Sequence, residues 1–328
     1  MSVTDESVST SDRADMTATT DRDEWLSWRR GGVGGSDIAA ICGLSPWASA
    51  LSVYLEKRGE IPPADLSDNG AVEFGIRMEP IMPGWFHDEC GLYVVGEQTW
   101  CSNPELPWMR CTVDGFVAES PDTAIDDVLG VYEAKVTGLA EWVDGIPENY
   151  QIQGQWQMAT TGLDHLWFAV AHRGAAKFRI YEMARDDGVI AELTRLGGDF
   201  WSRVEVGNPP PADGSEATAA ALAAAYPRHE EGVSVDLDPG LLDRYRIAQG
   251  RVDAAQNDLD VITNEIKAAL GEAEAGLIDG APFVTWKAQT RKGLDAKRIK
   301  SEHPALAKKY ATESDPFRVM RFATTKEK

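Results

Sequence analysis

The fold is decided by a stretch that reads Val113-Asp114-Gly115, then Val131-Tyr132-Glu133-Ala134-Lys135, then Tyr150-Gln151-Ile152-Gln153. The pattern predicts a hairpin followed by a helix, with a first strand over 109–113 that ends at Asp114 and Gly115 allowing a sharp turn after it. Alternate residues of a strand point to the same face, so Glu133 and Lys135 should lie side by side. If the two strands pair, two carboxylates and one ammonium group meet at one place.

Such a group suits a hard divalent cation, which binds a few oxygen ligands and leaves other positions to water and phosphate. A neighbouring lysine can orient or deprotonate an attacking water, or stabilise charge on a phosphate. Glu-x-Lys taken alone is more often an ordinary ion pair. The apolar residues Val128, Leu129, Val131 and Tyr132, however, predict a buried strand, where unpaired charges cost free energy. The whole pattern therefore favours a metal site.

Two segments before this stretch carry further candidate residues. Around Arg29-Arg30, paired glycines predict a tight loop, with Ser36 as the N-cap of a short helix through Ile41. A hydroxyl and an arginine at a helix N-terminus can bind an anion, and a capped helix with an exposed arginine is the alternative. Residues 70–91 predict a second helical region, broken by its prolines, with Glu79 inside it. An exposed helix glutamate is the alternative interpretation of Glu79.

These motifs in this order resemble the PD-(D/E)xK nuclease superfamily. Over roughly residues 25–186 the chain is similar to one branch, the YqaJ-type viral recombinases, which include the lambda exonuclease-like proteins. Val113 departs from the proline often seen before the aspartate in that superfamily, at a position that only shapes the turn. The resemblance implies an α/β fold with a restriction-endonuclease-like core, meaning a mixed central sheet flanked by helices.

The resemblance also implies roles for individual residues. Mg2+, with Mn2+ as an alternative, would be held by Asp114, Glu133, the Ala134 carbonyl and Glu79. Lys135 and Gln153 would position and activate the attacking water, Gln153 being favoured over Gln155. Arg29 and Ser36, with Arg30 as a near alternative to Arg29, would hold the 5′-phosphate of a DNA end.

The expected activity is Mg2+-dependent exonuclease digestion of double-stranded DNA ends in the 5′-to-3′ direction. The product would be a 3′ overhang, which a phage single-strand annealing protein would receive as partner. An endonuclease or a single-strand repair nuclease would keep the same chemistry on a different substrate. A non-catalytic DNA-end-binding protein is a further alternative, although it would not need Asp114, Glu133, Lys135 and Gln153 together.

Composition limits these interpretations. The net charge of −21 argues against a nucleic-acid partner. Residues 281–328, however, hold 12 Lys or Arg against 5 Asp or Glu, so a basic segment exists. No apolar run is long enough to span a membrane and no signal peptide is recognisable, so a cytoplasmic protein is expected. The four cysteines, with no C-x-x-C pair, are expected to be reduced and buried: Cys42, Cys90, Cys101 and Cys111.

Three regions are predicted along the chain. Residues 1–22 form a disordered acidic tail, 23–212 the nuclease domain and 213–328 a helical and basic C-terminal region. Within the last region, apolar residues from Leu241 to Ile266 alternate by four and three, which is a heptad pattern. The pattern permits oligomerisation or docking of a partner, and packing within the chain is the alternative.

Overall fold

The structure is a computed structural model that describes residues 15–18, 22–138, 142–174, 177–290, 292–312 and 318–322. The chain divides into two compact units, Met1–Pro227 and Arg228–Lys328. No helix among the described residues is both long enough and apolar enough to cross a membrane.

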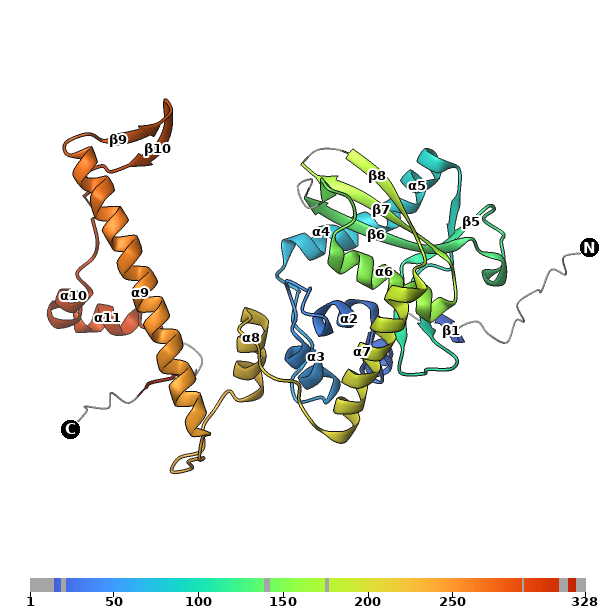
Figure 1. Cartoon of the computed structure of the whole chain (residues 1–328), viewed down its shortest axis with the longest axis horizontal. Helices are drawn as coiled ribbons and strands as arrows, with labels where there is room; N and C mark the ends of the chain where they lie inside the picture. The colour runs from blue at the N-terminus through green and yellow to red at the C-terminus, as the bar shows by residue number, and fades with distance from the viewer. Residues whose placement is uncertain are drawn as a thin grey trace, which may run out of the picture. The chain divides into compact units, whose positions relative to one another are not determined.

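A mixed five-stranded sheet lies at the centre of the first unit (Figure 1). Its order is β2 (Tyr93–Val95), β5 (Gly115–Ala118), β6 (Gly130–Gly138), β7 (His165–Arg173) and β8 (Lys177–Ala184). β6 and β7 run parallel, while the other neighbours are antiparallel. A parallel pair needs a long crossover connection, and helix α6 (Glu148–Thr161) provides it.

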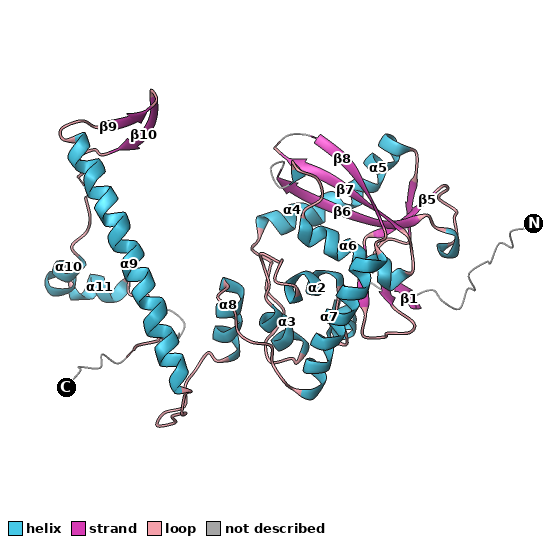
Figure 2. Cartoon of the chain, in the orientation of Figure 1, coloured by secondary structure: helices cyan, strands magenta, loops and turns pink. Residues whose placement is uncertain are grey.

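Helices cover both faces of this sheet (Figure 2). α6 covers one face, where Met158 packs with Phe168 and Val170. α4 (Gly70–Met78), the short turn η2 (Glu79–Ile81) and α5 (Met82–Cys90) cover the other, where Phe86 packs with Tyr132. The predicted break near the prolines is thus confirmed, as is the fold class of a mixed sheet flanked by helices.

A second sheet of the first unit has the order β1 (Asp15–Ala18), β3 (Thr99–Ser102) and β4 (Arg110–Val113). The predicted pairing of residues 109–113 with the Glu133 strand is therefore wrong, because β4 pairs with β3 and β6 pairs with β5. Gly115 is needed for a different reason than the predicted turn. A Cβ there would lie 2.5 Å from Val94 Cγ1, so the position is closely packed.

Further helices of the first unit are α1 (Arg22–Arg30), α2 (Gly35–Ile41), α3 (Ala50–Lys57), α7 (Asp187–Val206) and α8 (Glu216–Ala225). The prediction that Ser36 caps α2 is wrong. Gly34 is the N-cap, and its N–H donates to the Asp37 carboxylate at 2.8 Å. Ser49 caps α3 as its sequence favours, and its hydroxyl accepts a hydrogen bond from Thr218 of α8 at 2.7 Å. Helix α8, which is rich in alanine, therefore packs within the first unit.

Two further expectations need correction. Residues 15–18, inside the predicted disordered tail, form β1, while 1–14 and 19–21 lie outside the described residues. All four cysteines are free, but only Cys101 and Cys111 are buried, and Cys90 is exposed.

The second unit contains one long helix, α9 (Pro239–Leu270). A hairpin follows, formed by β9 (Ala275–Ile278) and β10 (Ala281–Thr285), and then α10 (Ala296–Glu302) and α11 (Pro304–Lys309). Pro239 stands in the first turn of α9, where its missing N–H needs no partner. The predicted heptad stretch lies entirely within this helix.

Candidate active site

Asp114 is the single residue between β4 and β5, where the chain passes from one sheet to the other. The β5–β6 ladder ends at the Gly115–Tyr132 pair, so the N–H of Ala134 has no strand partner on that side. The Asp114 carboxylate accepts this N–H through Oδ2 at 2.8 Å. The end of the ladder thereby fixes Asp114 against the Glu133 strand.

Glu133 is buried on β6 and accepts hydrogen bonds from three side chains. Lys135 Nζ and Gln153 Nε2 both lie 2.6 Å from its Oε1. Gln157 Nε2, one helical turn further along α6, donates to its Oε2 at 2.7 Å. Lys135 in turn lies 5.0 Å from the Tyr150 ring, as in a cation–π contact. The structure thus brings together Asp114, Glu133, Lys135 and Gln153, as the sequence predicted.

Glu79, in the turn η2, belongs to the same group of side chains. It lines a cavity of about 220 Å³ together with Asp114, Glu133, Ala134 and Lys135. Gln98, which has a left-handed φ of 55°, donates a hydrogen bond to Glu79. A non-glycine residue in this conformation is strained, so the surrounding structure must hold Gln98 there.

The carboxylates of this cavity repel one another. Burial, and then the charges of Glu133 and Glu79, raise the pKa of Asp114 well above its ordinary value. Burial and Glu133 likewise raise the pKa of Glu79. Burial would lower the pKa of Lys135, but Glu133 and Asp114 outweigh it and raise that pKa, so Lys135 stays charged. Among the described residues that line the cavity, three carboxyl groups thus share a single ammonium.

A hard divalent cation fits this donor set, because carboxylate and carbonyl oxygens are its preferred ligands. Asp114 and Glu133, with the Ala134 carbonyl and Glu79, are the residues that could hold it. Within the described ranges, no three or more His, Cys, Asp or Glu side chains form a ready-made chelating group. The Glu133 oxygens are instead hydrogen-bonded to Lys135, Gln153 and Gln157.

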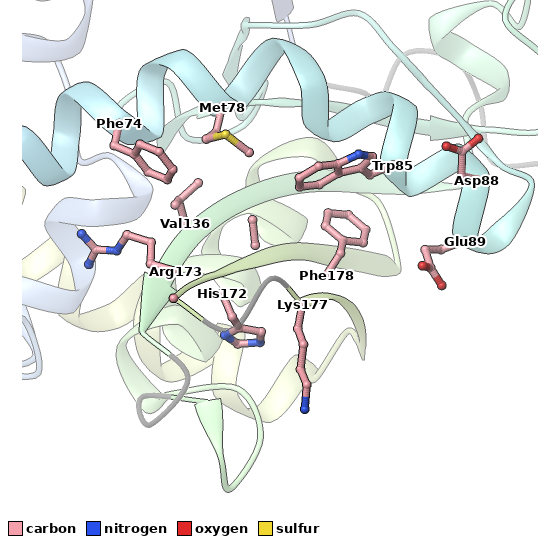
Figure 3. Close-up of a pocket in the computed structure, with 12 residues that line it drawn as sticks. Phe74, Met78, Trp85, Asp88, Glu89, Val136, His172, Arg173, Lys177 and Phe178 are labelled. Carbon is pink, nitrogen blue, oxygen red and sulfur yellow. The ribbon is translucent and has the colours of Figure 1, made fainter.

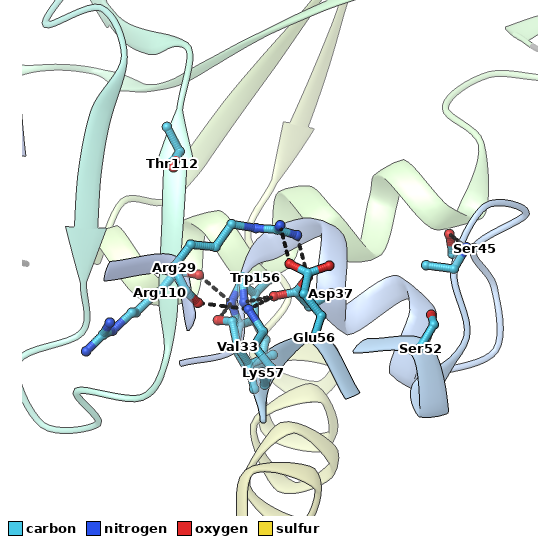
Figure 4. Close-up of polar contacts among 12 residues, drawn as sticks. Arg29, Val33, Asp37, Ser45, Ser52, Glu56, Lys57, Arg110, Thr112 and Trp156 are labelled. Atoms are coloured by element: carbon cyan, nitrogen blue, oxygen red, sulfur yellow. Dashed lines mark hydrogen bonds and ion pairs between the residues drawn. The ribbon is translucent and has the colours of Figure 1, made fainter. Parts of the chain in front are cut away.

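A second, smaller cavity of about 100 Å³ lies on the other side of Gln153 and Gln157. Arg29 and Ser36 line it, as the predicted phosphate-binding role requires. Arg29, however, is paired with two carboxylates, Asp37 and Glu56, both at 2.8 Å (Figure 4). Arg30 is exposed at the end of α1 and does not line either cavity within the described residues.

Arg110 also lines the smaller cavity. Its guanidinium donates to the carbonyls of Pro107 and Trp28 and lies 5.2 Å from the Trp28 ring. It has no carboxylate partner among the described residues, and burial lowers its pKa. Among the described residues, carboxylates therefore compensate the charge of Arg29 but not that of Arg110.

An ion pair between Asp37 and Lys57 supports the smaller cavity, because Asp37 also pairs with Arg29, which lines it. Lys57 Nζ lies 2.6 Å from Asp37 Oδ2, and both side chains are almost fully buried. Burial raises the pKa of Asp37, but Lys57 and Arg29 together hold it well below its usual range. Such a low pKa stabilises the fold at neutral pH, and that stabilisation is lost as the pH falls through the folded-state pKa.

Replacing Lys57 with methionine should therefore strongly destabilise the first unit. The change leaves Asp37 buried with Arg29 as its remaining cation, and breaking a buried pair costs about 3 kcal/mol. Urea unfolding followed by tryptophan fluorescence measures the effect. Arg195→Met, which breaks ion pairs exposed to solvent, is the control and should change the unfolding midpoint little. Equal midpoints for the two variants would contradict the prediction.

A third cavity, of about 670 Å³, adjoins the first, since Val136 lines both. Figure 3 shows Phe74, Trp85 and Phe178 around it, with Arg173 at one end. His172 extends to the opposite side of the strands (Figure 3). The walls are thus partly aromatic, with the charged residues Asp88, Glu89, Arg173 and Lys177 also among the lining, and they come from α4, α5 and the ends of β6–β8.

Two residues of these sites were missed in the sequence: Gln98 and Arg110. Gln157 lies one turn after Gln153 on the same helix face, which the sequence predicts to look into a polar site, but it was given no role of its own. Gln155 donates to the Ala184 carbonyl and accepts the N–H of Asp186, so it supports the fold away from the carboxylates.

Comparisons with known proteins identify relatives of this chain. A family model described as the YqaJ-like viral recombinase domain matches residues 24–164. A Bacillus subtilis (strain 168) protein described as uncharacterized protein YqaJ is 30% identical over 318 residues, covering 93% of this chain and 96% of its own length. An alkaline exonuclease (LHK-Exo) from Laribacter hongkongensis is similar at 22% identity and a TM-score of 0.46, covering 57% of this chain and 94% of its own. Its complex with dAMP gives 21% identity and a TM-score of 0.47, with the same coverage. On the family model and the Bacillus relative, the chain belongs to the YqaJ-like viral recombinase family.

Proposed function

We propose that this protein is a Mg2+-dependent deoxyribonuclease that digests double-stranded DNA from its ends in the 5′-to-3′ direction. One observation carries the proposal. Asp114, Glu133, Glu79 and Lys135 line one cavity, in which burial and then repulsion between carboxylates raise the pKa of Asp114 and Glu79. Negative charge concentrated in this way is what a divalent cation neutralises. Ion pairing within the fold alone would not require the excess carboxylates.

A bound cation would supply positive charge next to the scissile phosphate and make water a stronger nucleophile at neutral pH. The side chains of the protein would position the reactants. Gln153 and Gln157 fix the two oxygens of Glu133, so that this carboxylate cannot rotate freely. Lys135 Nζ lies 2.6 Å from Glu133, where its ammonium would orient water and stabilise developing charge on the phosphate.

The smaller cavity supports the preference for a DNA end. Ser36 offers a hydroxyl and Arg110 an uncompensated charge, and both line a space bounded by Gln153. A terminal 5′-phosphate held there would lie on the other side of Gln153 from the carboxylates and would set the polarity of digestion. Digestion from 5′ ends leaves a 3′ overhang, which is the substrate of a single-strand annealing protein.

Three DNA substrates test this proposal in the presence of Mg2+: a linear duplex with 5′-phosphates, the same duplex with 5′-hydroxyls, and a closed circle. We expect the phosphorylated duplex to be digested at least about tenfold faster than the hydroxyl form, because charge-assisted hydrogen bonds are the strong ones. The circle should stay intact. Arg110→Gln should remove the preference for phosphate, while Arg30→Gln, the exposed control, should keep it.

The other outcomes point to the alternative functions. Equal cutting of the closed circle would indicate an endonuclease. Binding of duplex ends without any cutting in Mg2+ or Mn2+ would indicate a non-catalytic end-binding protein.

The aromatic cavity beside the carboxylates would serve the proposed function as a surface on which unpaired bases stack. Each stacked base contributes about 1–3 kcal/mol, so Phe74→Ala combined with Trp85→Ala should weaken single-stranded DNA binding by roughly 10-fold or more. Fluorescence anisotropy with a labelled oligonucleotide measures the change. Ile76→Ala is the matched control, since Ile76 lies on the same helix, is 64% exposed and does not line the cavity. Unchanged affinity of the double variant would exclude the stacking role.

A further inference from the structure

Helix α9 carries an apolar stripe that the described residues leave uncovered. The stripe consists of Leu241, Tyr245, Ala248, Val252, Ala255, Leu259, Ile262 and Ile266. No residue of α9 is buried, and Val252 and Leu259 are 62% and 57% exposed. Phe322 stacks on Tyr245 at one end only, with ring centroids 4.0 Å apart. Helices in proteins draw most of their stability from packing of an apolar face. We therefore expect another surface to pack against a stripe of this length.

A row of four charged residues runs beside the stripe. Each stands directly before one of its larger residues: Arg244 before Tyr245, Arg251 before Val252, Asp258 before Leu259, and Glu265 before Ile266. In heptad terms this is one flanking row, whose charges select the partner and its orientation. The first half of the row is positive and the second half is negative. None of the four residues forms an ion pair among the described residues.

The order of charges along this row is complementary to the order in the same row running in the opposite direction. When a second α9 packs antiparallel along the stripe, the row faces the same row running the other way. Arg251 then meets the partner's Asp258, and Arg244 meets the partner's Glu265. Twofold symmetry repeats each pair, so every charge of the row finds an opposite one.

The residues of the stripe fit the same orientation. Antiparallel packing sets Val252 against the partner's Ala255, and Leu259 against the partner's Ala248. A large residue then faces a small one in the middle of the helix, which lets the side chains interdigitate. Parallel packing in register would instead set alanine against alanine and would place the charged row beside glutamine, threonine and leucine.

We propose that α9 forms an antiparallel helical pair with α9 of a second copy of this chain. Charge complementarity between the two halves of one row selects this occupant, and an unrelated partner helix would not explain that symmetry. The pairing does not depend on the nuclease activity, because none of these residues belongs to the cavities of the first unit.

Charge reversal in the full-length protein tests the proposal, with the dimer dissociation constant measured by sedimentation equilibrium. Arg244→Glu with Arg251→Glu sets like charges opposite each other in every pair. At about 0.5–1 kcal/mol per pair, this should weaken dimerisation roughly 100-fold. Asp258→Arg with Glu265→Arg should do the same. The protein carrying all four changes restores every pair in reverse and should dimerise within about threefold of the wild type.

Asp243→Arg is the matched control, because Asp243 lies on the outer face of α9, and it should leave the dissociation constant unchanged. Circular dichroism of each variant checks that the helix is intact. A wild-type protein that is monomeric would overturn the proposal and leave the stripe to a different partner. An oligomer that neither reversal weakens, or one that the fourfold exchange does not restore, would overturn it equally.

Discussion

Replacing Lys135 with methionine is expected to lower the rate of Mg2+-dependent DNA hydrolysis by about 10³-fold, the usual effect of removing a charge that stabilises a transition state. Among the described residues, Lys135 supplies the one ammonium that lines the carboxylate cavity, and its Nζ lies 2.6 Å from Glu133. Methionine keeps most of the side-chain volume but supplies no donor and no charge. Single-turnover hydrolysis of a 5′-phosphorylated duplex, at saturating protein, measures the chemical step directly.

Binding of the same duplex in Ca2+ should change little in this variant, which separates a defect in chemistry from a defect in affinity. Lys135→Arg is the conservative control, and it should keep part of the rate because its charge is retained. A Lys135→Met protein that hydrolyses DNA at more than a tenth of the wild-type rate would show that Lys135 serves only as a structural ion pair.

Replacing Asp114 with asparagine should abolish hydrolysis and yet stabilise the metal-free protein. Burial, Glu133 and Glu79 raise the pKa of Asp114, so its ionised form is disfavoured in the folded state. A carboxyl group whose folded-state pKa is raised destabilises the fold above that pKa, and the penalty disappears as the pH falls through it. Asparagine removes the charge, while its carbonyl oxygen can still accept the N–H of Ala134.

At neutral pH in a chelator, we therefore expect Asp114→Asn to melt about 2–5 °C above the wild type, which corresponds to roughly 1–2 kcal/mol for a unit of this size. Adding Mg2+ should raise the melting temperature of the wild type and leave that of the variant unchanged. Asp122→Asn, an exposed acid in the following turn, is the control. A variant that melts below the wild type in chelator would show that the Asp114 charge stabilises the fold, contrary to the repulsion described here.

Part of the candidate site could be predicted from the sequence because it depends on local geometry. Glu133 and Lys135 share a face through the period of two in a strand, and Gln153 follows on the next helix. The expected pairing of the strand before Asp114 with the Glu133 strand suggested Asp114 as the second carboxylate. The reason given for Asp114 was nevertheless wrong, because β4 pairs with β3 and Asp114 instead marks the passage between two sheets.

The remaining contacts could not be predicted because they depend on how distant elements pack. Arg29 was expected to be available to phosphate, but Asp37 and Glu56 hold it in ion pairs. Glu56 lies on another helix, so sequence spacing alone does not show that contact. Arg110 stands on β4, and only the packing of α1 against that strand brings it to the cavity with Ser36.

The most direct test of the central claim is the hydrolysis of a linear, 5′-phosphorylated duplex by the wild type and by Glu133→Gln, each with Mg2+ and with a chelator. Glutamine keeps the size of the side chain and an oxygen acceptor for the hydrogen bonds from Gln153 and Gln157, but it removes the charge. We expect rapid digestion by the wild type in Mg2+ alone, and a rate at least about 10³-fold lower in the variant. Digestion by Glu133→Gln at the wild-type rate, or by the wild type in chelator, would contradict that claim.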